Sequence, residues 1–214
     1  VEVSKTPLPH QIRKSNTVSL FAALQKQHIE AERIHLKDDK ESIRKELSNV
    51  LKTYDVVMLS GGVSKGKFDF IPEVMESLDV KKVFHRVAQR PGKPFWFGVQ
   101  KAQKTVVFSF PGNPVSTFAN YHIYFLPWLS KSLSLQYHER QVLLKESIEV
   151  KPPLTRFIQV KLNNDKGVLW ATKVRENGSG DLTSLVHSDG FICLRPRKTA
   201  YEKGEPIAFI STKP

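Results

Sequence analysis

The apolar run DVVML at residues 55–59, which leads straight into the glycine pair of SGG, places the strongest constraint on how this chain can fold. A continuous apolar run of this length predicts a strand that is covered on both faces. The flanking segments, KESIRKELSNVLKTY and FIPEVMESL, have the apolar spacing of helices. We therefore expect an α/β domain in which this strand lies centrally in the sheet.

The other segments before residue 134 repeat this alternation. Strand-like runs occur in KVFHRVAQ, PFWFGVQ and TVVFSF, and residues 114–133 form a long helical pattern that Pro127 should kink or end. Strands that alternate with helices are typical of a three-layer α/β domain with a largely parallel sheet.

Past Leu133 the pattern changes to short strand candidates separated by Asn, Asp, Gly and Pro, with DLTSLVH as a possible short helix. The NNDKG segment at residues 163–167 predicts a hairpin turn between two of these strands. We therefore predict an α/β domain at residues 1–138 and a β-rich domain at residues 139–214.

Composition narrows the classes of protein. No apolar run approaches the roughly 20 residues that span a bilayer, and the first residues lack the apolar core of a signal peptide, so we expect neither membrane insertion nor export. Cys193 is the single cysteine, which excludes an internal disulfide and favours a cytoplasmic protein. The formal net charge of +12 favours an anionic partner, but no motif that reads nucleic acid accompanies it.

Two segments carry residues that suit an anion or a ring. Gly61 and Gly62 permit positive φ and let a ligand approach main-chain N–H groups, although a plain glycine turn accounts for them equally well. HRVAQRPGKP at residues 85–94 places Arg86 and Arg90 on one face of a predicted strand, with Lys93 in its exit turn. Paired guanidinium groups suit a phosphate or another oxyanion, and a charged edge strand is the alternative.

Two further features are ambiguous in the same way. FPGNPVS at residues 110–116 is a strand-to-helix junction whose prolines should make a stiff wall, or simply a stiff turn. Asp38 and Asp69 each precede a helical pattern. Each can cap a helix or help to hold Mg²⁺, which binds one or two carboxylates together with phosphate oxygens.

Taken in order, SGGVSKGKFDF, HRVAQRPGKPFWFG, FPGNPVS and GSGDLTSLVHSDGFICL closely resemble the motifs of the molybdopterin molybdenumtransferases, the MoeA family that includes the gephyrin E domain. The resemblance covers nearly all of the chain. It implies a molybdopterin-binding α/β domain followed by a small C-terminal β-barrel. It also implies the insertion of molybdate into adenylylated molybdopterin with release of AMP, assisted by a divalent cation such as Mg²⁺, in a homodimer.

The resemblance assigns roles by position. Asp38 and Asp69 match acidic residues of the active site, both as catalytic groups and as metal ligands. The cations that would attract molybdate and phosphate are Arg86, Arg90 and Lys93. The residues that would contact the molybdopterin are Ser60, Gly61, Gly62, Val63, Ser64, Pro111, Gly112, Asn113 and Pro114. Lys65 and Lys67 depart from the glycine loop of the family, in which an acidic residue is common.

The family's Thr-Gly-Asp-Glu-Leu segment would fall before Val1, so the resemblance implies a C-terminal portion that lacks turnover by itself. Three alternatives remain open. A molybdopterin adenylyltransferase shares the α/β fold but has a different glycine loop and no C-terminal β-domain. A scaffold would bind partner peptides, as the gephyrin E domain does. A basic nucleic-acid binder would lose affinity steeply with salt.

Overall fold

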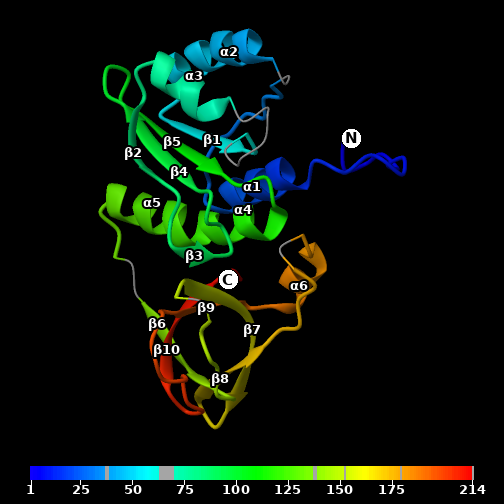
Figure 1. Ribbon diagram of the computed structural model, residues 1–214, viewed down its shortest axis with the longest axis vertical. Helices are drawn as coiled ribbons and strands as arrows, with labels where there is room; N and C mark the ends of the chain where they lie inside the picture. Colours follow the sequence, from blue (N-terminus) through cyan, green and yellow to red (C-terminus); the bar gives the residue numbers. More distant parts are fainter. Residues whose placement is uncertain (37–38, 63–69, 137–138, 152, 179, 214) are drawn as a thin grey trace. The chain divides into compact units, whose positions relative to one another are not determined.

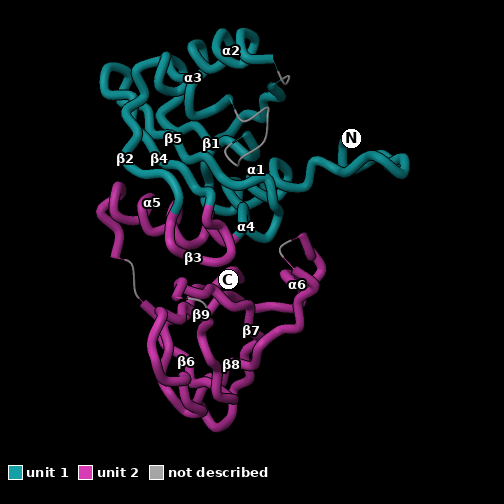
Figure 2. The backbone as a smooth tube through the Cα atoms, in the orientation of Figure 1, with its two compact units in different colours: residues 1–86, 94–118 teal, residues 87–93, 119–214 magenta. Residues whose placement is uncertain are grey.

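The computed structural model describes residues 1–36, 39–62, 70–136, 139–151, 153–178 and 180–213. The chain divides into two compact units that interleave along the sequence. One unit consists of Val1–Arg86 with Pro94–Phe118, and the other of Val87–Lys93 with Ala119–Pro214 (Figure 2). The predicted boundary between domains at residues 1–138 and 139–214 remains a proposal, separate from this division into compact units. Within the described residues, no helix is long and apolar enough to cross a membrane.

In the described part of the first unit, four strands form one sheet in the order β1-β5-β4-β2 (Figure 1). They are β1 (Val56–Ser60), β2 (Lys81–His85), β4 (Trp96–Gln100) and β5 (Thr105–Phe110). β1 and β5 are parallel, but β4 is antiparallel to both β5 and β2. The sheet is therefore mixed, and the prediction of a largely parallel sheet is not confirmed. Only residues 101–104 connect β4 to β5, and a connection this short produces a hairpin.

Helices α2 (Lys40–Thr53) and α3 (Ile71–Ser77) pack on one face of this sheet (Figure 1). α2 forms where the sequence predicts a helix, because its apolar residues recur at four-residue intervals. The side chains buried together in this layer include Ile43, Leu47, Leu51, Val57, Ile71, Val74, Met75 and Val107. β1 is a strand as predicted, with Val57 buried in this layer, but it stands at the edge of the four described strands and not at their centre.

The long helix predicted for residues 114–133 forms in three parts. α4 (Pro114–Asn120) is followed by the π-helical segment η1 (Tyr121–Phe125) and by α5 (Leu126–Ser132). The Leu126 N–H donates to the Tyr121 carbonyl, which is the wider π turn. Pro127 has no N–H and lies in the first turn of α5. The predicted interruption at this proline therefore takes the form of a π turn.

In the second unit, the described strands close into a β-barrel, as the family resemblance implies. The strands are β3 (Gln89–Arg90), β6 (Arg140–Leu144), β7 (Thr155–Asp165), β8 (Val168–Lys173), β9 (Gly190–Leu194) and β10 (Pro206–Ser211). Their order is β3-β7-β8-β6-β10-β9, and β9 also pairs with β7, so five of these described strands form a closed ring. The short helix α6 (Leu182–His187) and the turn at Lys166 and Gly167 between β7 and β8 both occur where the sequence predicts them.

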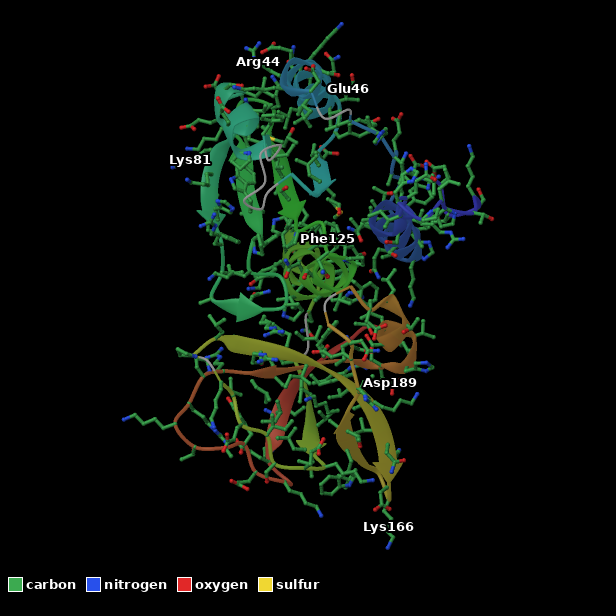
Figure 3. All side chains as sticks on the ribbon, turned by 45° about the vertical axis from the view of Figure 1, so that its right-hand side comes forward. Arg44, Glu46, Lys81, Phe125, Lys166 and Asp189 are labelled. Carbon is green, nitrogen blue, oxygen red and sulfur yellow. The ribbon has the colours of Figure 1, made fainter. Side chains whose placement is uncertain are left out.

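Asp189 directly precedes β9, and its carboxylate contacts residues of β7 and the residue Lys213 that follows β10 (Figure 3). Its carboxylate accepts a hydrogen bond from the Leu162 N–H at 2.8 Å. It also lies 3.0 Å from the Lys213 ammonium and 3.4 Å from the Lys161 ammonium. Partial burial by itself would raise the pKa of Asp189, but the Leu162 N–H and the two ammonium groups outweigh burial and lower the pKa.

Asp189→Asn is expected to lower the free energy of unfolding at pH 7 by about 1 kcal/mol, because charge-assisted contacts become neutral ones. A lowered folded-state pKa means that this stabilisation is complete above roughly pH 4 and is lost as the pH falls through the folded pKa. Urea unfolding of both proteins at pH 7 and pH 3 measures the difference. If the two proteins differed in unfolding free energy as much at pH 3 as at pH 7, the charge of Asp189 would not be what stabilises the fold.

Candidate functional site

The loops that follow β1 and β5 leave the sheet at the same edge. The two strands are parallel neighbours, with Ser60 paired to Phe110. The Gly61 N–H donates to the Phe110 carbonyl at 3.1 Å, which extends the pairing by one residue. In open α/β sheets, ligands commonly bind outside the carboxyl ends of neighbouring strands. Two segments predicted to contact the cofactor thus meet where a ligand site is expected.

The two glycines of the first loop have different roles. Gly61 has a φ of +94° and Gly62 a φ of +71°, which side chains rarely adopt. A Cβ atom on Gly62 would lie 2.6 Å from Cγ1 of Ile71, so the packing of α3 requires this glycine. No described atom lies within 4 Å of a Cβ atom on Gly61. Because the Gly61 N–H is already bonded, a ligand can approach its open Cα face but not a free N–H.

Two hydrogen bonds from Thr117 hold the second loop. The Thr117 hydroxyl donates to the Pro111 carbonyl at 2.6 Å, and the Thr117 N–H donates to the Asn113 carbonyl at 2.9 Å where α4 begins. A Cβ atom on Gly112 would lie 3.6 Å from the Cα of Gly61, so the two loops are in van der Waals reach. The PGNP segment therefore forms a fixed wall beside Gly61.

Asn16 connects both loops. Its Nδ2 donates to the Ser60 hydroxyl and to the Gly112 carbonyl, each at 2.8 Å. Its Oδ1 is buried and accepts no hydrogen bond from the described residues. We call Asn16, Ser60, Gly61 and Gly112 the loop junction. It joins backbone segments that lie 44 and 96 residues from Asn16 in the sequence.

Sequence reasoning missed this role of Asn16. In the structure it lies inside α1 (Ser15–Lys26), whose N-cap position is Lys14. A signal was present, because Asn16 precedes the buried Leu20 and Leu24 at four-residue spacing. A polar residue in line with buried leucines is one whose polar atoms need partners within the protein.

The three predicted anion-binding cations do not share one strand face. β2 ends at His85, and Arg86 has a φ of +63°, which breaks the two-residue alternation of a strand. Arg90 belongs to β3, which pairs with β7 in the second unit, and Lys93 lies in that unit too. The prediction that Arg86 and Arg90 share one face of a strand is therefore wrong. All three side chains are exposed, and none forms an ion pair with a described residue.

Several predicted site residues lie outside the described residues, namely Asp38, Val63, Ser64 and Asp69, together with Lys65 and Lys67. The described cap of α2 is Asp39, whose side chain accepts a hydrogen bond from the Ser42 N–H at 2.8 Å. Across the described ranges, no three His, Cys, Asp or Glu side chains gather where a metal ion could bind. Mg²⁺ at Asp38 and Asp69 therefore stays a sequence-based prediction.

Two protein-family models match the chain, one after the other. The first is described as a probable molybdopterin binding domain and matches residues 1–131. The second is the MoeA C-terminal region (domain IV) and matches residues 141–212. The loop junction lies entirely within the first matched region, and the five-strand barrel lies within the second except for Arg140, the first residue of β6.

Individual relatives agree with these models. A molybdopterin molybdenumtransferase of Synechocystis is 38% identical over 211 residues, covering 98% of this chain and 52% of the relative. One from Bacillus subtilis is 30% identical over 217 residues, covering 97% of this chain and 49% of the relative. The crystal structure of a MoeA protein from Pyrococcus horikoshii is similar with a TM-score of 0.80 and 27% identity, covering 100% of this chain and 52% of that one.

The chain thus spans about half the length of the curated relatives that it matches. Both halves of the match, the molybdopterin-binding model and the MoeA C-terminal model, occur in the order that the sequence motifs imply. The chain belongs to the MoeA family of molybdopterin molybdenumtransferases.

Proposed function

We propose that this chain carries the molybdopterin-binding domain and the C-terminal domain of an enzyme that inserts molybdate into adenylylated molybdopterin and releases AMP. The names of the relatives support the reaction class. The observation that carries the proposal is the loop junction, which lies at the carboxyl ends of β1 and β5 and within the matched molybdopterin-binding region.

In this proposal the open Cα face of Gly61 receives the flat pterin ring. Residues without side chains let a ring lie within van der Waals distance of the backbone. The buried Oδ1 of Asn16 accepts a hydrogen bond from a pterin N–H, which supplies the partner that the described residues do not. The Ser60 hydroxyl accepts its bond from Asn16 and can donate its own proton to the ligand.

The remaining assignments come from the family motifs. The other residues that we place around the molybdopterin are Gly62, Val63, Ser64, Pro111, Asn113 and Pro114. Arg86, Arg90 and Lys93 attract molybdate and phosphate oxygens, for which their exposed positive charges are suited. Asp38 and Asp69 serve catalysis and hold Mg²⁺. The enzyme works as a homodimer in the cytoplasm.

The alternatives are less well supported. A molybdopterin adenylyltransferase would lack a C-terminal β-domain, whereas this chain has a closed barrel in the region matched by the MoeA C-terminal model. A peptide scaffold or a nucleic-acid binder gains no support from the relatives cited above, which are named as transferases.

We expect the 214-residue chain alone to release no AMP from adenylylated molybdopterin and molybdate. Catalysis requires groups held in place around the whole cleft, and the relatives are about twice as long as this chain. A fusion of the N-terminal half of the Synechocystis relative to this chain is expected to release AMP and to form the molybdenum cofactor. Chromatography of AMP and mass spectrometry of protein-bound molybdenum measure the two products.

Two controls accompany this experiment. The fusion without molybdate shows whether AMP release depends on metal insertion, and the Synechocystis half alone shows whether this chain contributes the activity. Full turnover by the 214-residue chain would overturn the need for a second half. A folded fusion that binds molybdopterin but releases no AMP with molybdate present would overturn the proposed reaction.

A further inference from the structure

The RPGK segment (residues 90–93) lies directly against a buried carboxamide. Gly92 has a φ of +88°, and a Cβ atom on it would lie 2.3–2.8 Å from the Oδ1, Nδ2 and Cγ atoms of Asn120. Asn120 is fully buried. Glycine at position 92 is therefore required by the contact with Asn120 as well as by its backbone conformation.

Hydrogen bonds from two carboxamides hold both central carbonyls of this segment. The Gln89 Nε2 donates to the Pro91 carbonyl and to the Asn120 Oδ1, each at 2.9 Å. The Asn120 Nδ2 donates to the Gly92 carbonyl at 3.2 Å. Gln89 is 3% exposed, so this network is shielded from water. Buried bonds of this kind fix a backbone more firmly than solvated ones.

Tyr124 completes the network. Its hydroxyl donates to the Gln89 Oε1, so both ends of the Gln89 carboxamide are bonded. Burial raises the pKa of Tyr124 to about 12, with a further contribution from Cys193, so the hydroxyl keeps its proton at neutral pH. Tyr124 lies in the π-helical segment η1 and Asn120 directly before it. Such segments occur frequently at functional sites.

The backbone around the segment is fixed as well. Arg90 pairs with Arg156 where β3 runs beside β7, and the Thr155 N–H donates to the Ala88 carbonyl at 3.0 Å. The Val87 N–H donates to the Lys93 carbonyl at 3.0 Å, which closes the loop on itself. Arg90 and Lys93 thus have exposed side chains. Their backbone is held by the pairing with β7, by the Val87–Lys93 hydrogen bond and by the bonds from Gln89 and Asn120.

We propose that Gln89, Asn120 and Tyr124 are positioning residues that preset the RPGK segment for a doubly charged tetrahedral oxyanion bound by Arg90 and Lys93. Two cations on a fixed backbone lose less conformational freedom on binding than cations on a mobile loop. A dianion of this shape accepts charge-assisted hydrogen bonds from both. Molybdate as the physiological anion rests on the proposed function, whereas the positioning role does not.

The test uses the 214-residue chain, with molybdate as the probe and sulfate and phosphate for comparison, in titration calorimetry at fixed ionic strength. Asn120→Ala and Gln89→Ala are each expected to raise the Kd for molybdate about tenfold, and Tyr124→Phe about threefold. Gln159→Ala is the matched control, since Gln159 is a buried carboxamide of the same unit that donates to Glu176 and Ser184. It should lower the melting temperature similarly but leave the Kd unchanged.

A double-mutant cycle separates positioning from general destabilisation. In a background of Arg90→Gln with Lys93→Gln, Asn120→Ala should have no further effect on the Kd for molybdate, because it acts through those cations. Additive effects, an equal Kd change in Gln159→Ala, or a parent chain that binds none of the three anions would each overturn the proposal. The two proposals can fail separately. If the parent chain binds molybdate, Asn120→Ala does not, and the fusion releases no AMP, the positioning role is supported and the proposed reaction is rejected.

Discussion

Asn16→Ala is expected to weaken the binding of molybdopterin roughly 100-fold. The substitution removes two donated hydrogen bonds, to Ser60 and Gly112, and a buried acceptor at the loop junction, which together correspond to about 2–3 kcal/mol. Without these bonds the two glycine loops lose the connection that holds them against each other. Quenching of pterin fluorescence on titration with the protein gives the Kd.

Two further variants sharpen this result. Thr17→Ala is the control, because Thr17 is the exposed neighbour of Asn16 and its hydroxyl donates to the Lys14 carbonyl at 3.4 Å, outside the loop junction. Asn16→Asp keeps the shape and an acceptor but loses both donated bonds, so it should bind nearly as poorly as Asn16→Ala. If Asn16→Ala bound molybdopterin as tightly as the parent chain does, the loop junction would not be part of the ligand site. Parent-like binding by Asn16→Asp alone would show that only the Oδ1 position matters.

Gly190→Ala is expected to prevent the barrel from closing, with a loss of more than about 4 kcal/mol in the free energy of unfolding. Gly190 begins β9 and pairs with both Val160 of β7 and Ser211 of β10. A Cβ atom there would lie 2.1 Å from the Ile210 carbonyl oxygen and 2.7–2.8 Å from the ring of Phe209. The carbonyl belongs to a paired strand and cannot move without breaking the ladder.

Gly180→Ala is the matched control for this prediction. Gly180 belongs to the same unit, has no positive φ, and a Cβ atom on it would meet nothing described within 4 Å. Circular dichroism during thermal and urea unfolding compares the two variants. If Gly190→Ala melted within a few degrees of Gly180→Ala, the close contacts at the barrel closure would be easily relieved and the prediction would fail.

Much of the fold could be predicted because its signals are local. The four-residue spacing of Ile43, Leu47 and Leu51 predicts α2, since one helix face must be apolar to pack on a sheet. The turn between β7 and β8 follows from the NNDKG segment, in which Gly167 has a φ of +85°. These signals lie within a few residues of one another and need no knowledge of distant partners.

Strand direction in the first sheet was not predictable in the same way. The alternation of strands and helices before β4 favoured parallel pairing, but β4 returns to β5 through residues 101–104 as a hairpin. Likewise, the segment containing Arg86 and Arg90 has the composition of one strand, yet the φ of +63° at Arg86 ends that strand. Both outcomes depend on which neighbour a strand finds, and β-pairing depends strongly on that context.

The sequence by itself determined the helices, the change from an α/β pattern to a β-rich pattern, and the family motifs. Periodicity, turn residues and motif order are properties of residues that are neighbours in the sequence. Only the tertiary structure decided that Asn16 bonds to Ser60 and Gly112, that Gly61 is open while Gly62 is packed, and that Asn120 and Gln89 clamp the RPGK segment. The hydrogen bonds of Asn16 and Asn120 named here join residues 28 to 96 positions apart. A buried carboxamide must find hydrogen-bond partners, but its own sequence neighbours do not reveal which distant backbone will supply them.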